Sequence, residues 1–153
     1  MKIYLSIIGG LFILTCVVVA YFIGYDPFSS QSLQESSKSY IEANVPAVIS
    51  KWSKDELLKR SSPQLLKSAN ENPAALDRQF KTLSKLGAMR SFGDVEGFAS
   101  NYTTNQNRIV TTAAYVATAK FKNGEAHISV RLIQSHGQWR FSFFKVDSPL
   151  LHK

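Results

Sequence analysis

The sequence predicts an α+β protein in which an N-terminal transmembrane helix is followed by helices packed on a curved antiparallel sheet. Residues 3–25 contain no charged side chain, and residues 33–86 repeat apolar side chains at helical spacing. Three later runs alternate apolar and polar side chains and are joined by short turns. We therefore expect a transmembrane anchor over residues 1–25, a polar linker over 26–32 and one folded domain over 33–153.

The N-terminal apolar segment has the length of a membrane span. Residues 3–25 would form a helix about 34 Å long, and the hydrocarbon core of a bilayer is about 30 Å thick. The apolar part of a secretory signal peptide is shorter, at about 7–15 residues. A lipoprotein signal at Cys16 would need small residues before it, where Leu14 and Thr15 stand. We expect an uncleaved anchor, with cleavage and lipid attachment at Cys16 as alternatives.

Charges beside the apolar segment predict its orientation. Lys2 precedes it, whereas Asp26 and Glu35 follow it before Lys38. The flank that carries positive charge usually stays in the cytoplasm. We therefore expect a single-pass protein of a bacterial inner membrane, with the lipid bilayer as one partner and the C-terminal domain in the periplasm.

One face of the expected span carries small side chains. Cys16, Ala20 and Gly24 recur at four-residue intervals, so they share one face of a helix. Small side chains allow two membrane helices to approach closely. The stripe predicts a helix-packing site, and its alternative is the ordinary abundance of small residues in membrane helices.

The chain is basic, and its single cysteine lies in the apolar segment. Lys and Arg number 18 against 11 Asp and Glu, a net charge of +7. This balance suits an anionic membrane surface or an acidic partner. The three histidines lack the spacing of metal ligands, and no cofactor motif occurs. The basic residues are spread without aromatic interleaving, so we expect no metal, no cofactor and no nucleic acid partner.

Residues 33–86 are expected to form several helices joined by tight turns. Pro46 should kink or split the first helix, because proline lacks the amide that the helix needs. SKDE at residues 53–56 predicts a capping box at the start of a short second helix. A serine before Pro63 and an asparagine before Pro73 predict the starts of two more.

Two short turns set the expected register of the last three strands. Asn123-Gly124 is a typical hairpin turn of type I′, and it would place Lys122 opposite Glu125. His136-Gly137 predicts a second hairpin, in which Leu132 lies opposite Phe141 and Val130 opposite Phe143. Residues 90–98 contain two glycines and should form a bent first strand, followed by a polar loop over 101–107.

The register of each hairpin follows from its own turn, and the two registers agree on which face of the sheet is apolar and which is polar. The apolar face, which the helices should cover, collects Tyr115, Ala117, Ala119, Phe121, Ala126, Ile128, Val130, Leu132, Trp139, Phe141 and Phe143. The opposite face carries apolar side chains among basic ones, namely Val116, Ile133, Phe144 and Val146 among Lys120, Arg131 and Arg140.

This pattern resembles the nuclear transport factor 2-like superfamily, a cone-shaped α+β fold that includes ketosteroid isomerases. The stretches WSKDELLKRSSPQLLKS, KLGAMRSFGDVEG and GQWRFSFFKVDSPLL look like those of a group of small bacterial proteins of unknown function. The resemblance covers residues 33–151 and implies a fold far more than an activity. One span plus such a domain also resembles the assembly subunit of type IV secretion systems, which has a longer tail and a larger domain.

The residue types available argue against an enzyme. Ketosteroid isomerases use a carboxylate base with a tyrosine and a protonated aspartate. Of Asp94, Glu96, Tyr102 and Tyr115, Tyr115 alone falls on the expected inner face. A general base must lie within hydrogen-bond reach of its substrate, and none can be placed there. We expect a protein that is not an enzyme.

Two functions remain open. The first is a membrane-anchored accessory or scaffold protein that binds a protein partner or a second copy, with interface candidates Arg131, Arg140, Phe144, Ile133 and Val116. The second is a binder of a small apolar ligand or lipid in the domain interior, with candidates Tyr115, Trp139, Phe141 and Trp52. The alternatives are a solvated sheet face in the first case and a packed core in the second.

Overall fold

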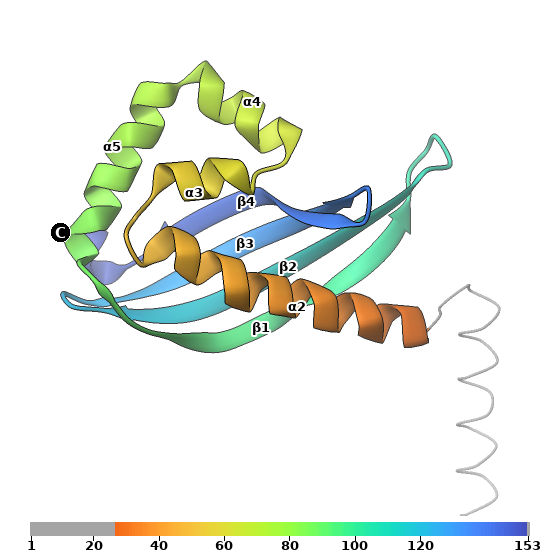
Figure 1. Cartoon of the computed structure of the whole chain (residues 1–153), viewed down its shortest axis with the longest axis horizontal. Coiled ribbons are helices and arrows are strands. Elements are labelled where there is room, and N and C mark those ends of the chain that lie inside the picture. Colours follow the sequence, from red (N-terminus) through yellow and green to blue (C-terminus); the bar gives the residue numbers. More distant parts are fainter. Residues whose placement is uncertain (1–26, 153) are drawn as a thin grey trace, which may run out of the picture. The chain divides into compact units, whose positions relative to one another are not determined.

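The computed structural model describes residues 27–152. The expected anchor over residues 1–25, with Cys16, Ala20 and Gly24, lies outside the described residues. No helix in the described part of the chain is long and apolar enough to cross a membrane. From Leu33 onward the chain forms one compact unit, in which helices precede an antiparallel sheet of four strands (Figure 1). The α+β class, with helices packed on an antiparallel sheet, is therefore confirmed, and the arrangement is compatible with a cone-like fold.

Four α-helices of the described residues lead into the sheet. They are α2 (Pro27–Ile49), α3 (Lys54–Lys59), α4 (Pro63–Glu71) and α5 (Pro73–Leu83), followed by the 3₁₀ turn η1 (Ser84–Leu86). The expected linker over 26–32 is wrong from Pro27 onward, because α2 begins there. Pro46 lies inside α2 without splitting it. Its missing amide would have bonded the carbonyl of Glu42, an exposed residue, where water can replace the lost bond.

The predicted helix starts are confirmed by their caps. Ser53, Ser62 and Asn72 each accept a hydrogen bond from the backbone amide three residues later, at 3.3, 3.3 and 3.1 Å. The capping box at residues 53–56 is only half formed, because the Glu56 carboxylate pairs with Arg60 and Lys59 instead. Each cap satisfies an amide that the helix itself cannot bond.

The four strands follow one another across the sheet in chain order. They are β1 (Met89–Thr103), β2 (Ile109–Phe121), β3 (Glu125–Ser135) and β4 (Gln138–Asp147). β1 is irregular between Met89 and Ser91 and between Gly93 and Glu96, which confirms the bent first strand. The loop expected over 101–107 is wrong in its first half, because β1 continues through Thr103.

The hydrophobic core lies between the helices and one face of the sheet. α2 contributes the fully buried apolar side chains Ile41, Val45, Val48 and Ile49. The sheet supplies the facing layer, and its fully buried members include Ile128, Leu132 and Phe141. The predicted apolar face of the sheet is thus the face that the helices cover.

The first hairpin is shifted by two residues from the predicted register. Lys120, rather than Lys122, lies opposite Glu125. Neither Asn123 nor Gly124 has the positive φ that a type I′ turn needs. Asn123 is held instead by η1, whose carbonyls accept from its backbone and side-chain amides at 3.0 and 2.8 Å. A two-residue shift leaves every side chain on its predicted face, because strand side chains alternate with period two.

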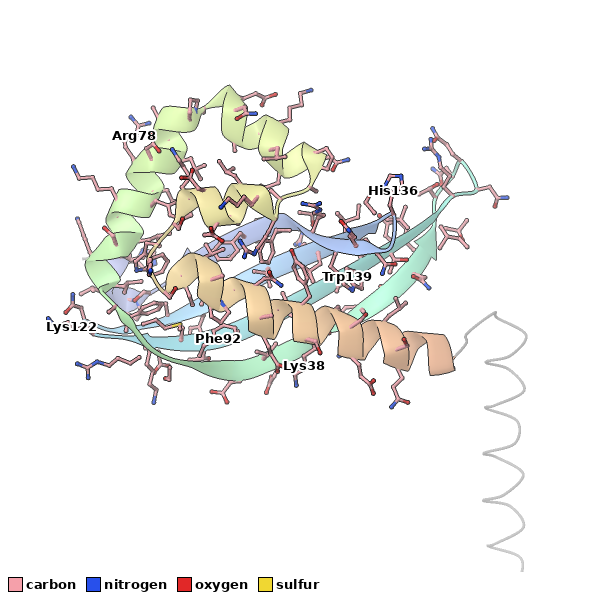
Figure 2. All side chains as sticks on the ribbon, viewed as in Figure 1. Lys38, Arg78, Phe92, Lys122, His136 and Trp139 are labelled. Carbon is pink, nitrogen blue, oxygen red and sulfur yellow. The ribbon has the colours of Figure 1, made fainter. Side chains whose placement is uncertain are left out.

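The second hairpin turns where the sequence predicts it. His136 and Gly137 have φ values of +51° and +75°, as a type I′ turn requires. Leu132 lies opposite Phe141 in the predicted register. Figure 2 shows His136 and Lys122, which mark the two hairpin turns, at opposite ends of the sheet.

A bulge at Ser142 then reverses the faces of the rest of β4. Phe143 is 39% exposed although the predicted register placed it inside. Phe144 and Val146 are inward-facing although both were expected outside, and the Phe144 ring lies 5.6 Å from the ring of Phe141. One extra residue in a strand moves all later side chains to the other face. Phe144 is therefore wrong as an interface candidate.

Candidate interaction surface

The face of the sheet opposite the helices is uncovered by the described residues (Figure 1). We call it the outer face. Its middle consists of three rows of side chains that run across β1, β2, β3 and β4 in register. The rows are Glu96, Val116, Ser129 and Lys145; Phe98, Ala114, Arg131 and Phe143; and Ser100, Thr112, Ile133 and Arg140.

Large apolar side chains of the outer face are open to solvent. Phe98 is 65% exposed, Tyr102 52%, Val116 47% and Phe143 39%. The Arg131 guanidinium lies over the Phe143 ring, 5.2 Å from its centroid, where a cation is attracted by the ring. Aromatic side chains and arginine are enriched at protein interfaces, so this face has the composition of a binding surface.

The predicted interface residues divide into three groups. Val116 and Arg131 are exposed on the outer face, and Ile133 is half-buried there. Arg140 is half-buried and turned to the sheet edge, where it donates to the Lys59 carbonyl at 2.9 Å. Phe144 lies inside, as described above.

Sequence reasoning missed three aromatic side chains of this surface. Phe98 and Tyr102 could have been found by continuing the alternation of β1 past its bend, because the register is regular from Glu96 to Thr103. Phe143 had no such signal, because its exposure depends on the bulge at Ser142.

Both edges of the sheet are occupied by groups from the helical half. At the β1 edge, the side-chain amide of Gln34 donates to the Gly97 carbonyl at 2.7 Å and accepts from the Ala99 amide at 2.9 Å. At the β4 edge, the Phe141 amide donates to the Arg60 carbonyl at 2.8 Å. Its carbonyl accepts from the Ser62 amide at 2.7 Å. Open edges recruit further strands, and these contacts occupy two backbone groups of each edge strand.

The four residues predicted to line an interior pocket belong to the packed core. Tyr115, Trp139 and Phe141 are buried, and Trp52 packs beside them with its ring 5.0 Å from that of Phe121. The Trp139 indole donates to the Ser36 hydroxyl at 3.2 Å.

Tyr115 carries the polar group that lies deepest among these candidates. Its hydroxyl lies 2.9 Å from that of Ser37 and donates to the Gln34 carbonyl at 3.2 Å. Burial raises the pKa of Tyr115 above its ordinary value. The hydroxyl is therefore neutral at pH 7 and bonded within the protein.

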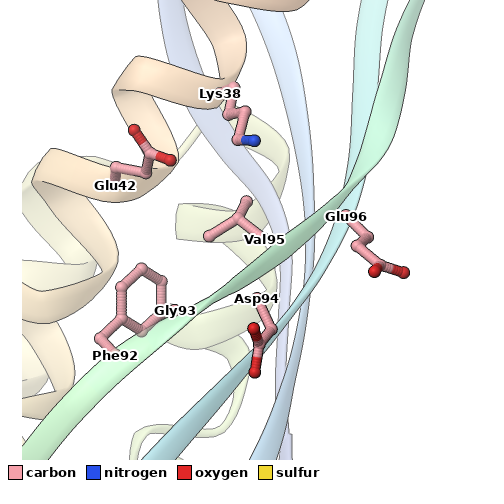
Figure 3. A pocket seen from close by; sticks show the side chains of 7 residues that line it. All are labelled: Lys38, Glu42, Phe92, Gly93, Asp94, Val95 and Glu96. Carbon is pink, nitrogen blue, oxygen red and sulfur yellow. The ribbon is translucent and has the colours of Figure 1, made fainter.

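An open pocket of 590 Å³ lies between α2 and the bend of β1. Figure 3 shows Lys38 and Glu42 reaching it from α2 and Val95 pointing toward that helix, while Asp94 and Glu96 point away. The acidic side chains therefore do not converge on one point. Within residues 27–152, no three His, Cys, Asp or Glu side chains are grouped to hold a metal ion.

A smaller and more apolar pocket of 240 Å³ lies under α4 and α5. Its apolar lining includes Leu57, Leu65, Leu76, Phe80 and Phe144. It lies beside β4, and its lining does not include the four residues that the sequence singled out for an interior site. It has the apolar character of a ligand pocket but is smaller than those that hold drug-sized molecules.

Comparison with known proteins adds no relative: no protein-family model matches the chain, and searches of curated proteins and of solved structures found no match.

Proposed function

We propose that this protein is a membrane-anchored accessory or scaffold protein without catalytic activity. In this proposal the anchor is the apolar segment over residues 3–25, and the domain is exported and has a nuclear transport factor 2-like fold. The domain binds a protein partner or a second copy of itself through the outer face. The observation that carries the proposal is the row of Phe98, Arg131 and Phe143, exposed on a face that no described element covers.

The state of the sheet edges supports binding through the face. Gln34 occupies the edge of β1, and Arg60 and Ser62 occupy that of β4. A partner strand that paired at these positions of either edge would first have to displace these bonds. The outer face offers apolar area without such a penalty, and burial of that area would stabilise a complex by about 25 cal/mol per Å² before the entropy of association is subtracted.

The placement of the candidate acids supports a role other than catalysis. Asp94 and Glu96 point away from the pocket beside α2 (Figure 3). The Tyr115 hydroxyl is already bonded to α2. An acid–base mechanism needs such groups aimed at a shared substrate position.

Photo-cross-linking in cells tests the proposal. A benzophenone side chain at Val116 should give a protein adduct of defined mass, while the same probe at the exposed Lys67 on α4 should not. Arg131→Glu should reduce the adduct from position 116, because the guanidinium belongs to the same surface. Equal adducts from both positions, or an adduct that Arg131→Glu leaves unchanged, would contradict the proposal.

Binding of a small apolar ligand is a second candidate function, favoured by the apolar pocket under α4 and α5. Its test is a fluorescence titration with N-phenyl-1-naphthylamine. Saturable binding should be lost in Ala75→Phe, because Ala75 lines the pocket and the larger side chain fills it. Binding that is absent, or equal in both proteins, would remove this candidate.

A further inference from the structure

Resting on the membrane anchor in the proposed function, we infer that the hairpin between β1 and β2 docks the domain on an anionic lipid surface. We call residues 101–111 the projecting hairpin. β3 pairs with β2 as far as Thr112, so the last three residue pairs of β1 and β2 lie beyond the point where that pairing ends. Figure 1 shows the turn of this hairpin extending past the turn between β3 and β4. The hairpin is therefore a two-stranded ribbon beyond the four-stranded part of the sheet.

Large apolar side chains are exposed on both faces of the projecting hairpin. Ile109 is 73% exposed, the largest value among the large apolar side chains of residues 27–152, and Tyr102 is 52% exposed. Ile109 lies opposite Thr103, the neighbour of Tyr102, so the two side chains point to opposite faces of the ribbon. A flat protein surface would cover one face, whereas the headgroup layer of a bilayer surrounds a hairpin that enters it. Tyrosine is also enriched at the membrane–water interface.

The charge at this end of the sheet suits an anionic surface. Residues 97–124 and 126–146 contain no Asp or Glu, and they include both turns of this end, β1 to β2 and β3 to β4. Arg108 is exposed beside the tip, and its guanidinium donates to the Gln106 side chain. Glu35 is the acidic residue that the start of α2 brings alongside β1 here. The tip itself therefore presents positive charge, which attracts anionic headgroups.

α2 runs antiparallel to β1, so its start lies toward the projecting hairpin. Gln34, near the start of the helix, bonds to Gly97 and Ala99. Lys38 and Glu42, farther along the helix, border the bend of β1 (Figure 3). The contact on β1 therefore moves toward the hairpin as α2 is followed back to its start. The chain enters the compact unit at the end of the sheet that carries the projecting hairpin.

The expected anchor keeps this end of the domain close to the bilayer. Leu33, the first residue of the compact unit, follows Tyr25 at the end of the apolar segment by eight residues. Eight residues span at most about 28 Å, whatever path they take. From Ala99, which Gln34 bonds, to Thr103 at the end of β1 is about 13 Å along the strand. The anchor and the tip of the hairpin can therefore reach one membrane surface together.

Quenching by spin-labelled lipid tests this contact in the reconstituted full-length protein. A bimane fluorophore would be attached at Asn105→Cys in a Cys16→Ser chain, in vesicles of phosphatidylcholine with and without phosphatidylglycerol. Both vesicles would contain a lipid with a nitroxide on its headgroup. We expect quenching at Asn105 that increases with phosphatidylglycerol, and little quenching of the same probe at Lys122→Cys, at the opposite end of the sheet (Figure 2). Equal quenching at the two positions, or quenching at Asn105 that phosphatidylglycerol leaves unchanged, would overturn the inference.

Two substitutions separate the apolar from the charged contribution. Arg108→Glu should lower the ratio of docked to undocked domain about fivefold or more in vesicles with phosphatidylglycerol, since one basic residue at an anionic surface contributes about that factor. Arg78→Glu, at an exposed arginine on α5, is the matched control and should leave quenching unchanged. Ile109→Asp should lower quenching in both vesicles, with an unchanged melting temperature because Ile109 is exposed. Quenching that neither Arg108→Glu nor Ile109→Asp lowers would contradict the role of the hairpin.

The outcomes separate this inference from the function on which it rests. A chain that stays in the vesicles after an alkaline carbonate wash, but shows no quenching at Asn105, overturns the hairpin contact and leaves the anchored scaffold in place. A chain that the wash removes from the vesicles overturns the anchor and the hairpin contact together.

Discussion

Tyr115 illustrates, at the scale of one residue, how the core holds a polar group. Its side chain is 2% exposed, and its hydroxyl joins β2 to α2 through Ser37 and Gln34. A buried hydroxyl without such partners would destabilise the fold by a few kcal/mol. Among the residue types that ketosteroid isomerases use, Tyr115 alone was expected on the inner face, and its bonds give it a structural role.

The raised pKa of Tyr115 makes stability depend on alkaline pH. Because burial raises the folded-state pKa, the unfolded chain loses the phenolic proton first, at about pH 10. The contribution of the neutral phenol is therefore complete below about pH 10 and is lost as the pH rises further. Urea unfolding between pH 7 and 11 should show a smaller alkaline loss of stability in Tyr115→Phe than in the wild type.

At pH 7 the same substitution should lower the free energy of unfolding by about 1 kcal/mol, because it removes a hydrogen bond. Tyr102→Phe, at a tyrosine that is 52% exposed, is the control and should leave the free energy of unfolding at pH 7 unchanged. An alkaline loss that is identical in Tyr115→Phe and the wild type would refute this assignment.

At the scale of one strand, the bulge at Ser142 separates two adjacent phenylalanines. Phe144→Ala should lower the free energy of unfolding by about 2 kcal/mol, since the ring is half-buried beside Phe141. Phe143→Ala should change it by at most about 0.5 kcal/mol, since its ring is partly exposed. Urea unfolding of the two variants gives the comparison. A larger loss of stability in Phe143→Ala than in Phe144→Ala would support the predicted register without a bulge.

Gly97 is the more tightly enclosed of the two glycines in β1. A Cβ built there would lie 2.0 Å from the Ala114 carbonyl oxygen, whereas a Cβ at Gly93 would meet nothing within 4 Å. Gly97→Ala should therefore lower the melting temperature by several degrees or prevent folding, and Gly93→Ala should leave it nearly unchanged. Circular dichroism melts of the two variants check this, and equal melting temperatures would show that β1 can move away from β2.

The two hairpins show why the sequence predicts the faces of the sheet better than its register. Hydrogen bonds to η1, which lies more than thirty residues earlier, hold Asn123 in place. These bonds from outside the hairpin fix the turn in place of the type I′ geometry that Asn123-Gly124 predicts. The resulting error in register is two residues, which leaves every side chain on its predicted face. The extra residue at Ser142 shifts the later part of β4 by one residue and so exchanges the faces of Phe143 and Phe144. No local sequence pattern marks that extra residue.

The candidate site was predictable only where it depends on alternation within one strand. Val116 and Arg131 follow from that alternation and lie where expected. The role of Gln34 could not be predicted, because its amide bonds residues 63 and 65 positions away in the sequence. Arg140 was expected on the open face, but a carbonyl 81 positions away holds it at the edge.

The expected orientation of the whole molecule gives a prediction for intact cells. If the domain is exported, a cysteine at the exposed His152 in a Cys16→Ser chain should react with a membrane-impermeant maleimide after the outer membrane is opened. The reason is that the positive flank at Lys2 would keep the N-terminus in the cytoplasm. A cysteine in place of Lys2 is the control and should react only after lysis. Labelling in the reverse pattern would place the domain inside the cell.

The bonded positions at the edges of the sheet also limit how copies of this chain could add to one another. A strand added to an open edge presents a new open edge, so growth by that route has no natural end. Gln34 at β1 and Arg60 and Ser62 at β4 occupy two backbone groups of each edge strand. A strand that paired at these positions would first have to break those bonds, so this part of each edge resists the open-ended pairing from which fibres grow.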